Sequence, residues 1–192
     1  MNVHHNAHTT NDAYILHSHV IDNIDVVQST AEDAPAIMNL LLQTAQWLNS
    51  KGSTQWSGLL RGEDHHNTTE SASRGDVYLF KDGESLAGIV TLLRSPSAWD
   101  INLWGEEGHE RAVYLHRLAI NREYGGRNLG DAMLQWVHTS IRFEGKDRIR
   151  LDCIDSNPQL DTFYRSAGYT YAGHSDAGFY LFERMQQLRQ QM

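Results

Sequence analysis

Cysteine and lysine are scarce in this chain, and each shortage excludes a class of structure or function. The single cysteine, Cys153, excludes an intramolecular disulfide and every metal site built from several cysteines. Only three lysines accompany thirteen arginines, and the formal net charge is −8. An acidic balance argues against a nucleic-acid partner, because such proteins must neutralise phosphates. An anionic ligand would therefore depend on backbone amides or on a few well-placed arginines.

Long apolar runs are also missing. No stretch approaches the roughly 18 consecutive apolar residues of a membrane-spanning helix, and the N-terminus shows neither the basic nor the apolar part of a secretion signal. We expect no membrane partner and a reducing, cytoplasmic setting. With 192 residues, 40% of them hydrophobic, and three prolines, the composition predicts one compact domain, or one domain plus a tail.

Histidines concentrate at the start of the chain. Residues 1–23 hold five of the eleven histidines and contain neither Lys nor Arg. Because no cysteine or regular helical spacing organises these imidazoles, we expect no metal site and interpret the segment as a mobile tail or an added strand. The working domain is then predicted to span residues 24–192.

From residue 24 onward, strand-like and helix-like patterns alternate. The predicted strands are 24–28, 77–81, 85–93, 112–120, 149–155, 169–171 and 179–184. The predicted helices run from about residue 30 to 51, from 129 to 141, and from 158 to 167. The polar stretch 53–75 is compatible with a short helix or an ordered loop. This order predicts an α/β fold, in the sense of an α+β mixed sheet, because hairpins alternate with crossovers around one sheet.

A glycine-rich turn joins the apolar strand 112–120 to the next helix. It reads Gly125-Gly126-Arg127-Asn128-Leu129-Gly130. Unpaired amides at a helix N-terminus, helped by the helix dipole, can cradle a pyrophosphate. The spacing matches neither the dinucleotide fingerprint nor the Walker A loop. By itself, the turn is equally explained as a β-to-α connection with a packing role.

Three segments of the chain carry a recognisable combination. They are Leu115-His116-Arg117-Leu118-Ala119-Ile120, the glycine turn, and the stretch from Asn157 to Gly168 that contains Phe163-Tyr164. Together they resemble the GNAT superfamily of acetyl-CoA-dependent N-acetyltransferases, over about residues 24–186. The resemblance implies a central mixed, splayed β-sheet flanked by helices. It also implies direct transfer of the acetyl group of acetyl-CoA to a primary amine of a small-molecule or amino-acid-like acceptor, without a metal.

The resemblance further implies which residues hold acetyl-CoA. The backbone of Leu118, Ala119 and Ile120 would pair with the pantetheine arm, and a main-chain donor there could polarise the thioester carbonyl. Residues of the turn and the helix start would bind the pyrophosphate: Gly125, Gly126, Arg127, Asn128, Leu129, Gly130 and Asp131. Asn157 would contact the cofactor, although capping of its helix explains this residue equally well.

Two positions of the turn depart from the family pattern. Gly125 stands where Gln or Arg is usual, and Asn128 stands where the first glycine is usual. Asparagine tolerates the left-handed conformation better than other non-glycine residues, so the backbone path can be kept. Arg127 would compensate as a cationic donor to phosphate.

Proton transfer requires an acid and a route for the proton of the amine. Tyr164 matches the family's tyrosine near the sulfur and is the candidate acid; the alternative is a core aromatic. His116 is the candidate base, with a structural histidine as the alternative, and Asp152, Asp155 or a water chain as rivals. Strand alternation would put His116 on one face with Tyr114 and Leu118. Cys153, among apolar and acidic neighbours, is interpreted as structural.

Aromatic and acidic residues suggest a cationic acceptor. In the family the acceptor is chosen by the first helices and the loops around the sheet's opening, which here carry Trp47, Trp56, Trp99, Trp104, Glu63, Asp64, Glu106, Glu107 and Glu110. Indole faces and carboxylates suit an amine. A non-catalytic acyl-CoA-binding sensor, favoured by the altered turn, and an unrelated nucleotide-binding domain remain alternatives. The final strands could pair between subunits in a homodimer.

Overall fold

An eight-stranded mixed sheet forms the centre of the computed structural model, which describes residues 13–186. Its strand order is β2-β3-β4-β5-β6-β8-β10-β9, and β1 and β7 form a separate two-stranded sheet. The strands are β1 Ala13–Ile15, β2 His19–Ile21, β3 Ile24–Gln28, β4 Val77–Asp82, β5 Ser85–Leu93, β6 Ala112–Ile120, β7 Ile141–Phe143, β8 Arg148–Ile154, β9 Thr170–Ser175 and β10 Phe179–Met185.

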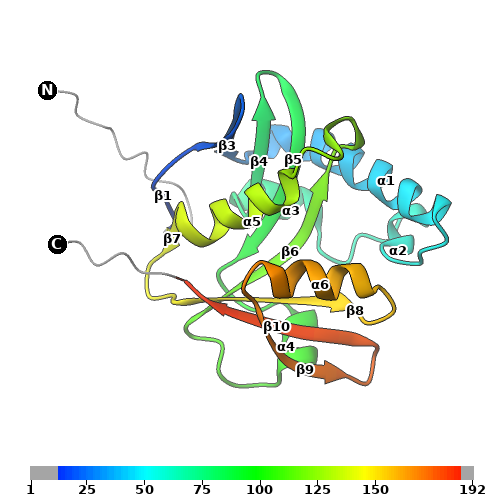
Figure 1. Ribbon diagram of the computed structural model, residues 1–192, viewed down its shortest axis with the longest axis vertical. Coiled ribbons are helices and arrows are strands. Elements are labelled where there is room, and N and C mark those ends of the chain that lie inside the picture. The colour runs from blue at the N-terminus through cyan, green and yellow to red at the C-terminus, as the bar shows by residue number, and fades with distance from the viewer. Residues whose placement is uncertain (1–12, 187–192) are drawn as a thin grey trace, which may run out of the picture.

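Helices cover both faces of this sheet (Figure 1). The α-helices are α1 Ala34–Ser50, α2 Ser57–Leu60, α3 Thr68–Arg74, α4 Ala98–Trp104, α5 Leu129–Thr139 and α6 Pro158–Ser166, and the 3-10 helices are η1 Ala31–Asp33 and η2 Arg122–Tyr124. One hydrophobic cluster packs α5 and α6 against the sheet, and a second packs α1 against the other face. The predicted mixed α/β fold is confirmed.

The first residues described belong to strands. β1 pairs antiparallel with β7, and β2 pairs antiparallel with β3. The indole Nε1 of Trp136 in α5 donates to the carbonyl of His17 at 2.7 Å, which ties this segment to the helix. The sequence left open whether residues 1–23 form a mobile tail or an added strand. Between residues 13 and 21 the structure contains two added strands, β1 and β2. Residues 1–12, with His4, His5 and His8, lie outside the described residues.

Helix α4, the 3-10 helix η2 and strand β7 escaped the sequence prediction. Helix α4 lies in the tryptophan-bearing loop and begins at a capping box, in which the side chains of Ser97 and Asp100 bond reciprocally to each other's backbone amides. The helix predicted to run to residue 141 ends at Thr139, and Ile141 instead starts β7. The polar stretch 53–75 contains α2 and α3. Among residues 13–186, no helix is long and apolar enough to cross a membrane.

The sheet opens between β6 and β8. These two strands run parallel, but they are paired only from Ala112–Tyr114 with Arg148–Arg150. Beyond this point β6 continues to pair with β5 as far as Ile120, and β8 continues to pair with β10 as far as Ile154. The two halves of the sheet therefore diverge, as the splayed sheet of the resemblance requires, and beyond this point the facing edges of β6 and β8 have no strand partner among residues 13–186.

Candidate active site

Ionisable side chains from three elements meet just beyond the last paired residues of β6 and β8, Tyr114 and Arg150. His116 comes from β6, Asp152 from β8 and Asp100 from α4, and one ring nitrogen of His116 and one carboxylate oxygen of each aspartate all lie within 4.8 Å of one another. His116 and Asp100 are buried, with 6% and 1% of their side chains exposed. Charged groups are rarely buried without a partner, so this cluster is a candidate functional site.

Asp100 and His116 form a direct pair. The imidazole Nε2 lies 3.0 Å from Oδ1 and 3.1 Å from Oδ2 of Asp100. Oδ2 also accepts bonds from the amide and the hydroxyl of Ser97, at 2.8 and 2.7 Å. Burial works to raise the pKa of Asp100, but the contacts with His116 and Ser97 outweigh it and hold that pKa below its ordinary value. Asp100 is therefore ionised at neutral pH.

Asp152 occupies the opposite side of the opening. Its Oδ1 accepts a hydrogen bond from the indole Nε1 of Trp99 at 3.2 Å, and the Trp99 ring packs edge-on against Phe179. Burial raises the pKa of Asp152, although the neighbouring His116 opposes the shift. Asp152 thus becomes easier to protonate than an exposed aspartate.

A second imidazole lies beside His116. The ring centroids of His66 and His116 are 4.9 Å apart. Burial, followed by the nearby His116 and Arg117, lowers the pKa of His66 to about 3. His66 also lines a small pocket between α1, α3 and the sheet, whose other lining residues are Ile37, Leu41, Thr68, Ser71, Val77, Thr91 and Arg117. The lining of the pocket thus contains the neutral imidazole of His66 and the guanidinium of Arg117, and both residues lie next to His116.

A bulge in β6 corrects the predicted face of Leu118. Arg117 has a φ of 50°, and the pairing of β5 with β6 shifts register between Ile89 and Thr91. The extra residue reverses the alternation that follows it. Leu118 therefore packs with the α5-side cluster that contains Leu115, whereas His116 faces α4 and His66 on the other side. The prediction that His116 and Leu118 share a face is wrong.

The Arg117 side chain at this bulge binds the segment that leads into α3. Its guanidinium, with 8% of the side chain exposed, pairs with Oδ1 of Asp64 at 3.0 Å and donates to Oγ1 of Thr68 at 2.7 Å. Asp64 in turn accepts the amide of Thr68 at the start of α3. Arg117 thus holds the segment from Asp64 to Thr68, which lines the pocket, against β6. Left-handed backbone at a non-glycine residue costs about 1–3 kcal/mol, and such strain is frequent at functional sites.

Tyr164 lies on the α6 side of the same opening. It is 7% exposed and packs against the rings of Phe163, Tyr169 and Phe182. Burial, together with Cys153 and Asp152, raises the pKa of its hydroxyl, so the proton stays on the oxygen at neutral pH. Burial likewise raises the pKa of the Cys153 thiol to about 12, which fits a structural cysteine.

The glycine turn leaves the start of α5 free to bind an anion. Asn128 adopts the left-handed conformation with a φ of 56°, as its position in the turn required, and the turn residues 125–128 are exposed. Within residues 13–186, no side chain caps the N-terminal amides of α5. A Cβ on Gly130 would come within 3.3 Å of Ile120 and Phe163, so glycine also lets α5 pack closely there. Arg127 lies over the ring of Tyr124, 5.2 Å from its centroid.

The other predicted cofactor residues are distributed around this turn. In the part of the chain that the structure describes, Leu118–Ile120 have no strand partner on the side facing β8, although the carbonyl of Ile120 accepts bonds from the Arg122 guanidinium. Asn157 caps α6, its Oδ1 accepting the amide of Gln159 at 3.1 Å. Asp131 is exposed in the first turn of α5. An unpaired strand edge that leads to an uncapped helix fits an extended ligand with a polyanionic end.

The tryptophans and carboxylates predicted to surround the acceptor come from several elements, with Trp47 on α1 and with Trp99 and Trp104 on α4. The rings of Trp47 and Trp104 are covered by the protein's own cations, Arg122 at 4.3 Å and Arg150 at 4.5 Å. Glu63 pairs with Arg61. From this set, Trp99 and Asp64 come nearest to the cluster, through Asp152 and Arg117.

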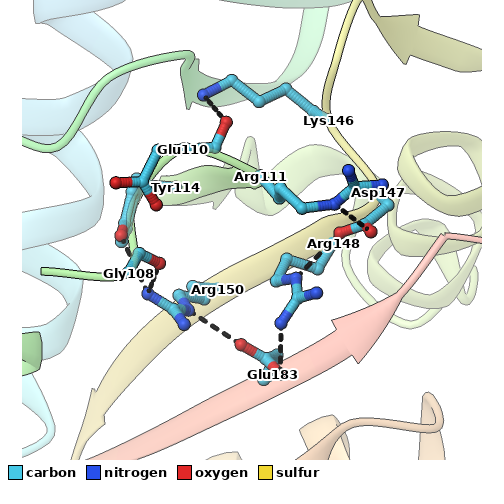
Figure 2. A network of polar contacts seen from close by, with 9 residues as sticks. All are labelled: Gly108, Glu110, Arg111, Tyr114, Lys146, Asp147, Arg148, Arg150 and Glu183. Atoms are coloured by element: carbon cyan, nitrogen blue, oxygen red, sulfur yellow. Dashed lines mark hydrogen bonds and ion pairs between the residues drawn. The ribbon is translucent and has the colours of Figure 1, made fainter.

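An arginine network holds the loop that follows α4, as Figure 2 shows. Arg150 of β8 donates to the carbonyl of Gly108 at 2.9 Å, to the hydroxyl of Tyr114 at 3.2 Å and to Glu183 at 2.8 Å. Arg111 pairs with Asp147 at 2.6 Å, and the ammonium of Lys146 donates to the carbonyl of Glu110 at 2.8 Å. The loop is fastened to the start of β8, which fixes the C-terminal end of α4.

Comparison with known proteins agrees with this architecture. A sequence profile described as the acetyltransferase (GNAT) family matches residues 41–169. An uncharacterized N-acetyltransferase of Bacillus subtilis (strain 168), YesJ, is 47% identical over 165 residues, which cover 86% of this chain and 92% of the relative. The chain therefore belongs to the GNAT acetyltransferase family.

Solved structures show the same fold. A GNAT-family acetyltransferase from Listeria monocytogenes 4b F2365 is 34% identical with a TM-score of 0.70, and the match covers 84% of this chain and 94% of that one. The PaiA N-acetyltransferase of Thermoplasma acidophilum, solved in complex with coenzyme A, has a TM-score of 0.62 at 16% identity, covering 85% and 99%. At that identity the likeness concerns the fold alone.

Proposed function

We propose that this protein transfers the acetyl group of acetyl-CoA directly to a primary amine of a small-molecule or amino-acid-like acceptor. The observation that carries the proposal is the opening between β6 and β8, which lies between an uncapped helix N-terminus and a buried cluster of proton-carrying groups. Membership of the GNAT family supports the reaction type. The identity of the amine rests on the chemistry of the site.

The residues present fit acetyl-CoA. The amides at the start of α5, with Arg127 beside them, would hold the pyrophosphate, and the free edge of Leu118–Ile120 would hold the pantetheine arm. Coenzyme A bound to a relative of the same fold is consistent with this arrangement. When bound, acetyl-CoA supplies an acetyl thioester. Everything else in the reaction is positioning and proton transfer, which the protein's own residues provide.

Two groups divide the proton transfers. His116 accepts a proton from the amine nitrogen as the new bond to the acetyl carbon forms, because it lies at the opening with Asp100 behind it. Tyr164 is protonated at neutral pH because its pKa is raised, and it gives its hydroxyl proton to the sulfur, where negative charge develops as the carbon–sulfur bond breaks. The amine thus becomes an amide, and coenzyme A leaves as the free thiol.

The acceptor is proposed to enter from the side of α1 and α3. The small pocket there, with a volume of about 10 Å³, is lined by apolar residues of α1 and by His66 and Arg117, and the His66 ring lies beside that of His116. Asp152 would favour an approaching ammonium group, since a nearby cation lowers the energy of its carboxylate form. This volume holds about one water molecule, so an amine would enter only as the lining side chains move, and a small amine requires the smallest movement.

Calorimetry and a thiol-release screen test the proposal together. Isothermal titrations with acetyl-CoA, coenzyme A and ATP are expected to show binding of the first two and not of ATP; the reverse would indicate a nucleotide-binding domain. A screen of polyamines, amino acids, aminoglycosides and short peptides is expected to release thiol with at least one amine class. Tight acetyl-CoA binding without turnover on any amine would favour the acyl-CoA sensor instead.

A further inference from the structure

Helix α4 contacts both sides of the opening through two consecutive residues. Trp99 donates its indole N–H to Asp152 of β8, and Asp100 pairs with His116 of β6. The two strands are not paired with each other at this level. The seven-residue helix α4 therefore fixes the positions of Asp152 and His116, one on each side of the opening.

We infer that Asp100 is a positioning residue for His116: its carboxylate holds the Nε2–H of the neutral imidazole and leaves the lone pair on Nδ1 as the proton acceptor. This inference rests on the proposed function, because it assigns a protonation state to the group that takes the proton of the amine. It adds a residue, a tautomer and a reacting atom that the family membership does not supply.

The geometry decides the tautomer. Both oxygens of Asp100 lie at hydrogen-bond distance from the same nitrogen, at 3.0 and 3.1 Å. An ionised carboxylate only accepts hydrogen bonds, so Nε2 must be the donor. A neutral imidazole carries one N–H, and the lone pair is then on Nδ1. A buried carboxylate orients a catalytic imidazole by the same logic in serine hydrolases.

Independent contacts keep Asp100 in place. The capping box with Ser97 holds the N-terminal end of α4. At the other end, Trp104 stacks against the Arg150 guanidinium, which also bonds to Gly108 in the loop that follows (Figure 2). With 1% of the Asp100 side chain exposed, water cannot compete for its oxygens. Held in this way, the pair needs little reorganisation during a proton transfer.

Titratable side chains from four segments of the chain surround His116. They are Asp100 from α4, Asp152 from β8, His66 from the segment before α3, and Arg117 from β6 with its partner Asp64. His66 stays neutral because burial depresses its pKa, and Arg117 is neutralised by Asp64. Among these groups, Asp100 is the one bonded directly to the His116 ring.

Nitrogen-15 NMR on the wild-type protein reads the tautomer directly and needs no substrate. At a pH where the ring is neutral, a long-range ¹H–¹⁵N spectrum, with His116 assigned from a His116→Gln sample, is expected to show a protonated Nε2 and an unprotonated Nδ1. A protonated Nδ1 in the wild type would overturn the inference. Acetyl transfer could still occur in that case, so the two claims fail separately.

Variants extend the test. Asp100→Asn is nearly isosteric but presents an amide that can donate or accept, so we expect the Nε2–H preference to be lost. Ser97→Ala, which removes a partner of Asp100 but not the bond to His116, should keep the preference. If Asp100→Asn fails to fold, Asp100→Glu serves, with the tautomer retained. An unchanged spectrum in folded Asp100→Asn would contradict the inference. So would a wild-type spectrum in which the Nε2 proton signal appears only after EDTA is added, because a metal ion held by His116, Asp100 and Asp152 would then occupy Nε2.

Discussion

Replacing Asp64 by asparagine tests how the ion pair between Asp64 and Arg117 stabilises the wall of the small pocket between α1, α3 and the sheet. Asp64 is the charged partner of Arg117, whose guanidinium is 8% exposed and lies on the bulge beside His116. The carboxylate also accepts the amide and the hydroxyl of Thr68, at 2.6 and 3.1 Å. Asp64→Asn keeps one oxygen for Thr68 but leaves a buried cation without its counter-charge.

The expected cost follows from the burial of the two partners. Breaking a fully buried ion pair by removing one partner costs about 3–5 kcal/mol. Asp64 is 24% exposed, so water can replace part of the lost interaction, and Thr68 still bonds to the guanidinium at 2.7 Å. We therefore expect Asp64→Asn to lower the free energy of unfolding by about 2–3 kcal/mol.

A matched pair of variants separates the charge from the contacts. Arg117→Met removes the buried cation and leaves Asp64 its bonds to Thr68, so we expect a loss of less than about 1 kcal/mol. The double variant should be more stable than Asp64→Asn alone, because no unpaired cation remains. Urea denaturation of the four proteins at one pH measures all three differences. An Asp64→Asn protein within about 0.5 kcal/mol of the wild type would refute the reasoning.

Three further outcomes are expected. Tyr164→Phe should lower kcat about 100-fold in the thiol-release assay while the affinity for acetyl-CoA stays the same, whereas an equal loss of both would mean a packing role. Arg127→Ala should weaken acetyl-CoA binding about 5-fold at low salt and less at high salt; unchanged low-salt affinity would remove Arg127 from the phosphate site. Burial and Arg184 lower the pKa of His138 to about 3 in the folded protein, below the ordinary 6.5, so the unfolded state binds more protons between these values and stability falls as the pH drops. His138 should contribute about 1.4 kcal/mol per pH unit to the slope between pH 6 and 4, so the slope should be smaller by about this amount in His138→Gln, whereas the contribution of His66 stays in both proteins. Equal slopes in urea titrations of the two proteins would count against a buried neutral His138.

Much of the fold could be predicted because its signals are local. The strand Ala112–Ile120 was predicted to the residue, since a run of nearly continuous apolar character is bounded by polar loops. Asn157 and Pro158 marked the start of α6 in the same way. Splaying of the sheet came only from the family resemblance, because strand pairing between β6 and β8 depends on residues far apart in the chain.

The candidate site was only half predictable. His116 and Tyr164 were found through the resemblance, but the face of Leu118 was wrong, because a left-handed arginine at 117 reversed the alternation. No propensity marks Arg117 for that conformation. Asp100 was missed altogether. The available signal was the capping box of Ser97 and Asp100, which indicates a helix start. Its contact with His116 arises only from tertiary packing.

The most direct test of the central claim is to quantify both products of one reaction. The protein is incubated with acetyl-CoA and each amine of the panel, the free thiol is titrated, and the acetylated amine is measured by mass spectrometry. We predict equal amounts of coenzyme A and N-acetyl product for at least one primary amine, and loss of both in Tyr164→Phe. Thiol release without any acetylated amine, or no release despite acetyl-CoA binding, would contradict acetyl transfer to an amine.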